Sequence, residues 1–222
     1  EILELFQEYV YGHSPGRPEH MSFEVFDEDK NALNGKATRK QVTIHFSEDP
    51  DGPSLDLLML VPNDVEGPVP AFLVLNFWGN HSILMDPAMK LSPNWMRSNE
   101  SHGIVDHRST EASRGKSIPR WSVDEIIDRG YALVTYYYGD MDPDFDDGFK
   151  NGIQPLFYKE GQTKPKENEW GSIGAWAWGL SRALDYLETD DSVDHTRVAV
   201  MGHSRLGKTA LWAGATDERF AI

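Results

Sequence analysis

The sequence predicts an α/β fold of three layers, in which a largely parallel sheet lies between helices. Three observations carry this prediction. Ala71 to Phe77 is a nearly continuous apolar run, which is typical of a strand buried on both faces. The helix pattern VDEIIDR is followed at once by the strand pattern YALVTYYY, and helix-to-strand crossovers of this kind build parallel sheets. Val198 to Met201 is a further strand pattern that leads directly into a helix pattern.

Length and composition indicate a globular protein. A chain of 222 residues with 39% hydrophobic residues can bury a core in one large domain or two small ones. The net charge of -15 disfavours nucleic acid as a partner, and no apolar run approaches the roughly 20 residues that span a bilayer, so we expect no membrane partner. The absence of cysteine excludes disulfides, thiolate zinc sites and a cysteine nucleophile. The acidity is compatible with a secreted or periplasmic protein.

The segments before the central strand predict an antiparallel lead-in to the sheet. The opening residues EILELFQEYVYG have the pattern of an amphipathic helix rather than that of a signal peptide. Three strand patterns rich in Val, Ile, Leu and Phe follow, separated by turn sequences such as DEDKNALNGK and SEDPDGPS. These strands are expected at Ser22 to Phe26, Gln41 to Phe46 and Leu55 to Val61.

Two long loops and two helices complete the expected order. The loops run from His81 to Trp121 and from Gly139 to Glu169, and long loops often build active sites. A capping box, Ser122-x-x-Glu125, is expected to open the first helix, and Gly130 is expected to end it. The second helix is expected at Ser172 to Leu187, where apolar residues recur at helical spacing.

The segment Gly202 to Thr209, with the sequence GHSRLGKT, satisfies two incompatible catalytic patterns. As G-x-x-x-x-G-K-T it is a phosphate-binding P-loop, whose amides and lysine hold nucleotide phosphates at a helix N-terminus. As a strand followed by Gly-x-Ser and a helix, it is a nucleophile elbow, a sharp turn that presents a serine hydroxyl above the sheet. Both patterns need a strand, a tight turn and a helix, so the local sequence does not separate them.

The position of this segment in the chain favours the elbow. A P-loop enzyme needs a later strand that ends in an acidic residue for magnesium, and only thirteen residues follow Thr209. Several strand patterns precede the segment, as expected when a hydrolase nucleophile comes late in the sheet. The remaining alternative is a serine that caps the helix in a Rossmann-like turn, with His203 and Arg205 merely exposed.

An elbow assigns a chemical role to Ser204. A serine hydroxyl needs a neighbouring base to take its proton, and the oxyanion that forms needs donors already directed at it. The amide of the next residue, Arg205, would point into the oxyanion hole together with the positive end of the helix, and its guanidinium could add a further donor. The usual G-x-S-x-G pattern has its second glycine two places after the serine, whereas here that place is Leu206 and the glycine is Gly207.

The sequence GHSRLGK resembles the G-[CH]-S-R-x-G-K motif of carbohydrate esterase family 15, the glucuronoyl esterases, and this motif explains the displaced glycine. The resemblance implies an α/β-hydrolase fold, a three-layer sandwich. Further matches span most of the chain. They are YGHSPGRP near the start, LNFWGNHS after the central strand, YYYGDMDPDFDDGF, and WGSIGAWAWGLSRALDYLETD ahead of the elbow.

The resemblance also implies roles and a reaction. Ser204 would be the nucleophile, Arg205 the oxyanion stabiliser through its amide and side chain, and Lys208 a donor to sugar hydroxyls. No cofactor is implied. Members of this family cleave esters that join glucuronic acid on xylan to lignin alcohols, so glucuronoxylan or a lignin-carbohydrate ester is the expected substrate. An acetyl xylan esterase is the first alternative, and a non-catalytic carbohydrate-binding fragment is an alternative of another class.

One departure from the hydrolase pattern concerns the catalytic triad. The expected order is serine, then acid, then histidine, yet all eight histidines precede Ser204, and only Asp217 and Glu218 supply carboxylates after it. The final residues RFAI would begin a further strand. We therefore expect residues 1–222 to be the N-terminal portion of a single α/β-hydrolase domain, incomplete at its C-terminal side, whose partner is the missing C-terminal part with the acid and the histidine.

Two further features of the sequence resemble binding sites. The aspartates between Asp140 and Asp147 alternate like calcium ligands, but the pattern lacks the glycine and the late glutamate of an EF-hand, so we expect a turn-rich loop whose carboxylates accept backbone amides, and no metal. His81 follows the central strand where hydrolases place their second oxyanion-hole segment. It is expected either to line the substrate pocket or to be a structural histidine.

Overall fold

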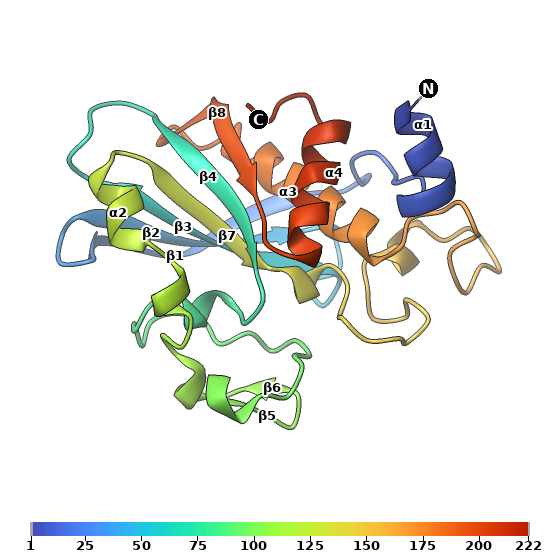
Figure 1. Ribbon diagram of the computed structural model, residues 1–222, viewed down its shortest axis with the longest axis horizontal. Coiled ribbons are helices and arrows are strands. Elements are labelled where there is room, and N and C mark those ends of the chain that lie inside the picture. Colours follow the sequence, from blue (N-terminus) through green and yellow to red (C-terminus); the bar gives the residue numbers. More distant parts are fainter. Residues whose placement is uncertain (1, 222) are drawn as a thin grey trace.

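The computed structural model describes residues 2–221 and has at its centre a six-stranded mixed sheet, in the order β1-β2-β3-β7-β4-β8 (Figure 1). Its strands are β1 (Ser22–Ala32), β2 (Ala37–His45), β3 (Ser54–Pro62), β4 (Val69–Asn76), β7 (Ala132–Tyr137) and β8 (Val193–Met201). The α-helices are α1 (Ile2–Phe6), which continues as a π-helical turn (Gln7–Tyr11), α2 (Val123–Asp128), α3 (Ser172–Leu187) and α4 (Arg205–Thr216). A small hairpin pairs β5 (Ile104–Val105) with β6 (Arg108–Ser109), and short 3-10 turns lie at Asn80–Ser82, Glu100–His102, Glu111–Ser113, Ile118–Arg120, Tyr138–Asp140 and Gln154–Phe157.

The sheet has an antiparallel part and a parallel part. Strands β1, β2 and β3 pair antiparallel, and β3 also pairs antiparallel with β7. Strand β4 lies between β7 and β8 and is parallel to both. The antiparallel lead-in and the parallel crossovers are therefore confirmed. Because parallel strands end at one edge of the sheet, the segments that follow β4, β7 and β8 meet there.

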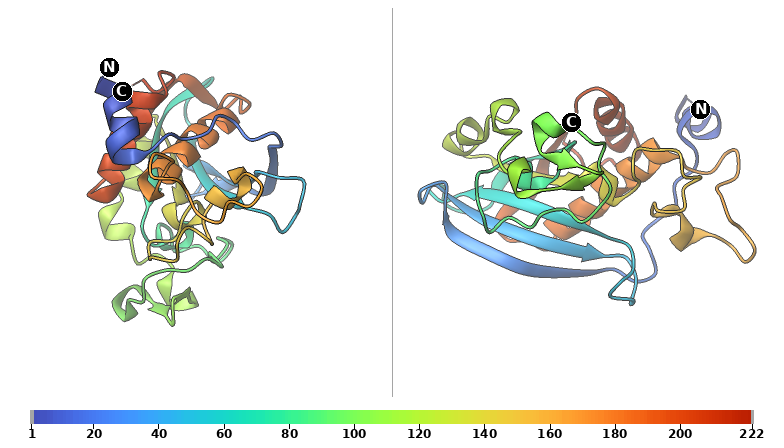
Figure 2. Two further views of the ribbon diagram at one scale, coloured as in Figure 1. Left: turned by 90° about the vertical axis from the view of Figure 1, so that its right-hand side faces the viewer. Right: turned by 90° about the horizontal axis from the view of Figure 1, so that it is seen from below.

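Two apolar clusters cover the two faces of the sheet and make three layers. On one face, Leu73 and Val134 belong to a cluster with α3 residues such as Leu180 and with Trp212 of α4. On the other face, Val74 and Leu133 pack with the α2 residues Val123 and Ile127. The right-hand view of Figure 2 shows strands β1 to β3, in blue to cyan, curving along one side of the molecule. Successive side chains of β4 thus pack into the two clusters in turn, as expected for a central strand.

The elements lie where the sequence predicts them, with longer strands at three places, and one of these is β2, which begins at Ala37 rather than at Gln41. Strand β1 continues to Ala32 although it was expected to end at Phe26, because its acidic and basic residues lie on an outer strand that faces water on most positions. Strand β8 begins at Val193 rather than at Val198. The two long loops are confirmed, and the first also contains the β5–β6 hairpin, which lies apart from the main sheet (Figure 1).

The predicted helix signals have different outcomes. Gly130 follows α2 with a φ of 77° and is the stop that was expected. The capping box is wrong, because the Ser122 side chain makes no capping hydrogen bond and its backbone carbonyl alone accepts from the amide of Ile126. Residues 217–221 do not form a strand, although the amide of Ala221 donates to the carbonyl of Val198 on β8 at 2.9 Å.

The opening helix lies beside α4 (Figure 1). Tyr11 packs on Trp212 of α4 with ring centroids 4.8 Å apart, and Phe6 lies 6.4 Å from the same ring. The remaining apolar side chains of this segment are largely exposed, including Ile2 and Tyr9. Among residues 2–221, the structure has no helix that is long and apolar enough to cross a membrane.

Candidate active site

Ser204 lies between the end of β8 and the first residue of α4, at the edge where the parallel strands end. Its backbone has φ 58° and ψ -126°, a conformation that a residue with a side chain rarely adopts. Holding it costs on the order of 1–3 kcal/mol, and such strain concentrates at functional sites. The residue is exposed, and no hydrogen bond of its hydroxyl occurs within residues 2–221. These features are those of a nucleophile elbow, and they contradict a helix-capping serine, since the Ser204 side chain makes no cap bond.

Two glycines permit this turn. A Cβ at Gly202 would lie 2.0 Å from the carbonyl oxygen of Leu206, a contact with backbone that cannot move aside. A Cβ at Gly207 would lie 3.3 Å from the carbonyl oxygen of Gly202, which is tighter than ordinary contact. The first turn of α4 therefore packs directly on the end of β8. The glycine is needed three places after Ser204, where this sequence has it.

The local geometry excludes the P-loop interpretation. The helix begins at Arg205, so the residues that would form a phosphate-binding loop are already helical. The amides of Gly207 and Lys208 donate to the carbonyl of Ser204. Thr209, which would hold magnesium, is fully buried, and its hydroxyl donates to the carbonyl of Arg205 at 3.1 Å. The amides and the hydroxyl that a nucleotide would need are therefore occupied.

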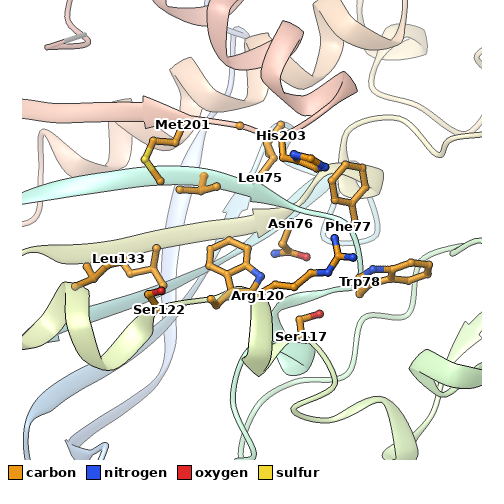
Figure 3. A pocket seen from close by; sticks show the side chains of 14 residues that line it. Leu75, Asn76, Phe77, Trp78, Ser117, Arg120, Ser122, Leu133, Met201 and His203 are labelled. Atoms are coloured by element: carbon orange, nitrogen blue, oxygen red, sulfur yellow. The ribbon is translucent and has the colours of Figure 1, made fainter.

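A cavity of about 770 Å³ opens beside the elbow (Figure 3). Figure 3 shows Met201 and His203 of the elbow on one side and Arg120 and Ser117 on the other. The residues that end β4 and follow it lie between them, and they are Asn76, Phe77 and Trp78. The cavity combines an apolar floor with polar groups from three segments, which is the usual composition of a small-molecule site. Sequence reasoning did not select His203 or Arg120 for this site, because the segments that contribute them meet only in the folded chain.

The guanidinium of Arg205 is held by a carboxylate from the loop that follows β7. Nη1 of Arg205 donates to Oδ2 of Asp144, and the same oxygen accepts from the Tyr138 hydroxyl at 3.1 Å. Arg97 lies at 3.9 Å from this oxygen. Tyr138 is buried, and burial, followed by the nearby charge of Asp144, raises the pKa of its hydroxyl, so the group stays protonated and donates. Sequence reasoning did not pair Asp144 with Arg205, because the contact spans 61 residues and leaves no local signal.

Lys208 and His81, the two residues expected to bind substrate, have different environments. Lys208 is exposed on the first turn of α4 and makes no hydrogen bond or ion pair through its side chain within residues 2–221. His81 is fully buried and is not among the residues that line the cavity, and its Nε2 has no hydrogen-bond partner within residues 2–221. Burial, followed by the charge of Arg114, lowers the pKa of His81 to about 4. Burial away from the cavity favours the structural role over the pocket-lining role for His81.

The aspartate-rich loop after β7 uses its carboxylates for backbone and side-chain contacts. Asp147 accepts the amides of Phe149 and Asn151, at 2.8 and 3.0 Å. Asp140 accepts from the Asn94 side chain at 2.7 Å and from the amide of Asp56 at 3.3 Å. The prediction of a turn-rich loop is confirmed. In the part of the chain that the structure describes, no three His, Asp or Glu side chains are arranged to hold a metal ion.

Asp142 in the same loop is almost completely buried, at 2% exposure, and its Oδ1 has no hydrogen-bond partner among the described residues. Burial is the main cause that raises the pKa of Asp142 to about 7, and the charges of Asp147 and Asp144 add to it, while Ser172 and Gln154 oppose it. The backbone of the same residue contacts α3, since its carbonyl accepts from the Trp176 indole at 2.9 Å.

The two carboxylates after Ser204 lie at the far end of α4. Asp217 follows the last helical residue and accepts from the Arg219 side chain at 2.6 and 2.9 Å. Within residues 2–221, no histidine forms a hydrogen bond with the Ser204 hydroxyl. The described residues thus supply an exposed serine hydroxyl at the N-terminus of α4, and none of their histidines is hydrogen-bonded to it.

Comparisons with known proteins bear on the family of the chain. The family model described as glucuronyl esterase of fungi matches residues 115–222, which include the elbow. The carbohydrate esterase MZ0003, from an unknown prokaryotic organism, is 48% identical over 222 residues, which are 100% of this chain and 51% of that protein. The chain therefore spans about half the length of this relative.

Solved structures give the same result. A glucuronoyl esterase from Solibacter usitatus superposes with a TM-score of 0.91 at 50% identity, over 99% of this chain and 55% of that one. A CE15 esterase from a marine bacterial metagenome, described as promiscuous, has a TM-score of 0.87 at 48% identity, over 99% of this chain and 54% of that one. The elbow, the sheet order and these relatives place the chain in the glucuronoyl esterase family, carbohydrate esterase family 15, with its α/β-hydrolase fold.

Proposed function

We propose that the protein to which this chain belongs is a serine carboxylesterase that cleaves glucuronoyl esters between xylan and lignin alcohols. The observation that carries the proposal is the strained, exposed Ser204 at the end of β8, followed at once by the N-terminus of α4. A nucleophile elbow holds its serine in such a conformation, because it presents the hydroxyl above the sheet. The family supports the class of ester.

The reaction would proceed through an acyl-enzyme on Ser204. The hydroxyl attacks the ester carbonyl while a base takes its proton, and the amide of Arg205 and the positive end of α4 stabilise the oxyanion. The alcohol then leaves, and water hydrolyses the acyl-enzyme. In α/β-hydrolases the acid and the histidine follow the serine in the chain, and no described residue takes the place of that histidine.

Lys208 and the cavity would bind the sugar portion of the substrate. Lys208 lies one helical turn after Ser204 on α4, with a side chain free to donate to sugar hydroxyls. The cavity beside Gly202 and His203 has room for a ring and its substituents. We propose no direct substrate contact for His81, since it is fully buried.

Steady-state hydrolysis by the full-length protein tests this function. We expect hydrolysis of a benzyl ester of glucuronic acid and its loss in Ser204→Ala, whereas the control Ser101→Ala, at an exposed serine of the Glu100–His102 turn, keeps the rate. Preference for acetylated xylan would instead support the acetyl xylan esterase alternative. Binding of xylan without hydrolysis of either ester would support the non-catalytic alternative.

We further propose that residues 1–222 belong to one α/β-hydrolase domain, because the two apolar clusters share a single sheet. The polymeric substrate suggests a secreted or periplasmic location, since a polysaccharide does not enter the cytoplasm. Detection of the protein outside the cytoplasm after cell fractionation would support this location.

A further inference from the structure

The loop after β7 reaches the elbow through one carboxylate. Asp144 lies four residues beyond the Tyr138–Asp140 turn, and Arg205 is the first residue of α4, two strands away in the sheet order. Nη1 of Arg205 donates to Oδ2 of Asp144. This hydrogen bond between charged groups is the one polar contact that the side chain of Arg205 makes within residues 2–221.

Asp144 is itself held in place from the core side. Its Oδ2 accepts from the Tyr138 hydroxyl, and the Tyr138 ring packs edge-on against Trp176 of α3, with ring centroids 4.9 Å apart. Tyr138 also meets the ring of Phe77, which follows β4, at 5.5 Å. The carboxylate is therefore fixed by a rigid aromatic group that contacts two layers of the fold, and the guanidinium is fixed by the carboxylate.

The exposure of the pair indicates what it does. The side chain of Asp144 is 21% exposed and that of Arg205 is 42% exposed. Ion pairs that water reaches to this degree add little to the stability of a fold. They do fix the direction of a long side chain that would otherwise adopt many rotamers, and a donor that is held in place before the reaction stabilises an oxyanion better than a mobile one.

We propose that Asp144, supported by the Tyr138 hydroxyl, is a positioning residue for Arg205 in the esterase reaction. The inference rests on the proposed function, because it gives the Arg205 guanidinium a task at the Ser204 oxyanion. It adds a residue from the loop after β7 to a site otherwise built from β8, α4 and the segment after β4. Asp144 acts only through Arg205 and has no contact with the reacting atoms.

A double-mutant cycle in the full-length enzyme tests this inference. Arg205→Ala is expected to lower kcat by about 100-fold, which is the usual loss when one oxyanion donor is removed. Asp144→Asn is expected to lower kcat by about 10-fold with KM changed less than twofold, because the guanidinium remains but is less well directed. Tyr138→Phe should lower kcat by a few fold. The matched control is Asp146→Asn, at an exposed carboxylate of the same loop that makes no hydrogen bond or ion pair within residues 2–221.

The double variant distinguishes a positioning role from a structural one. If Asp144 acts through Arg205, Asp144→Asn causes no further loss once Arg205→Ala is present. Equal fold losses from Asp144→Asn with and without Arg205 would overturn the inference, as would a kcat equal to that of the Asp146→Asn control. Activity that survives Ser204→Ala would overturn the proposed function itself, whereas loss of activity in Ser204→Ala with additive effects at Asp144 and Arg205 would overturn only this inference. Thermal unfolding checks that each variant is folded.

Discussion

The ends of strands β7 and β8 lie at the same edge of the sheet, but the chain leaves them in opposite ways. After β8 the chain turns within Gly202, His203 and Ser204 and enters α4 with a strained backbone and a free hydroxyl. After β7 it enters a long loop in which the carboxylates of Asp140, Asp144 and Asp147 are engaged by amides or by tyrosine and arginine side chains. The turn after β8 has a strained backbone, which lowers stability but exposes the Ser204 hydroxyl. The loop after β7 instead fixes the Arg205 side chain through Asp144.

The largest expected effect comes from removing the exposed hydroxyl at the end of β8. Ser204→Ala should lower the esterase kcat of the full-length protein by about 10⁴ to 10⁶, because the nucleophile is lost while the fold is kept. The measurement is hydrolysis of a benzyl glucuronate ester, with circular dichroism to show that the variant is folded. A loss below tenfold would show that the reaction does not pass through this hydroxyl.

The second effect concerns the turn itself. Gly202→Ala should lower the free energy of unfolding by about 3 kcal/mol, since the new methyl group meets the Leu206 carbonyl at 2.0 Å and the helix must move away. Gly16→Ala is the control, because a Cβ at Gly16 has open space around it. Urea unfolding of both variants makes the measurement. Equal midpoints would mean that the strand and the helix are not packed as closely as described.

The third effect concerns the loop after β7, and it is the pH dependence of stability that Asp142 contributes. The pKa of Asp142 is raised from 3.8 to about 7, mainly by burial. Below about pH 4 the carboxyl is protonated in both states and its contribution to stability is complete. As the pH rises toward 7, the unfolded chain releases the proton while the folded chain keeps it, so stability falls by about 1.4 kcal/mol for each pH unit over this range. Asp142→Asn should remove this part of the pH dependence.

Urea unfolding at pH 5 and pH 8 makes the measurement for Asp142→Asn. Asp146→Asn is again the control, since this carboxylate is exposed. Profiles of Asp142→Asn and the wild type that run parallel would show that Asp142 is ionised in the folded protein. The loop after β7 would then contain a buried charge rather than a buried neutral carboxyl group.

The smallest effect isolates the strain at the elbow. Ser204→Gly and Ser204→Ala both lose the hydroxyl, but only glycine adopts a φ near 58° without a steric cost. We therefore expect Ser204→Gly to be more stable than Ser204→Ala by about 1 kcal/mol, because relief of strain exceeds the greater freedom of glycine in the unfolded chain. Equal unfolding midpoints would show that the conformation carries no strain.

The sequence predicts most of the fold because its strands and helices have clear apolar periodicity. The continuous run at β4 and the helical stripe of α3 are confirmed almost to the residue. Strand β1 was expected to be shorter because charged residues such as Asp27 and Lys30 resemble a turn, and only the pairing with β2 makes them part of an outer strand. Pairing of this kind is a tertiary property that propensity does not contain.

In the candidate site, too, the local part is predictable from the sequence and the part that depends on tertiary contacts is not. The elbow is visible in the sequence, because Gly202, Ser204 and Gly207 must occupy fixed positions in a short turn. The neighbours of the elbow are not visible, since Asp144 and Arg120 come from loops whose course is set by the whole fold. The P-loop is excluded only by the structure, because Thr209 is buried and its hydroxyl donates to the carbonyl of Arg205.

The pairing of β4 with β8 has a consequence for how the chain folds. Leu73 lies beside Val200, so the pairing of these strands closes a long stretch of chain that contains both loops and β7. Contacts between such distant parts of a sequence form slowly, since loop closure is unfavourable until they are made. During refolding, the amides of β8 should therefore be among the last in the sheet to become protected against hydrogen exchange, and the turn that holds Ser204 cannot acquire its shape before then.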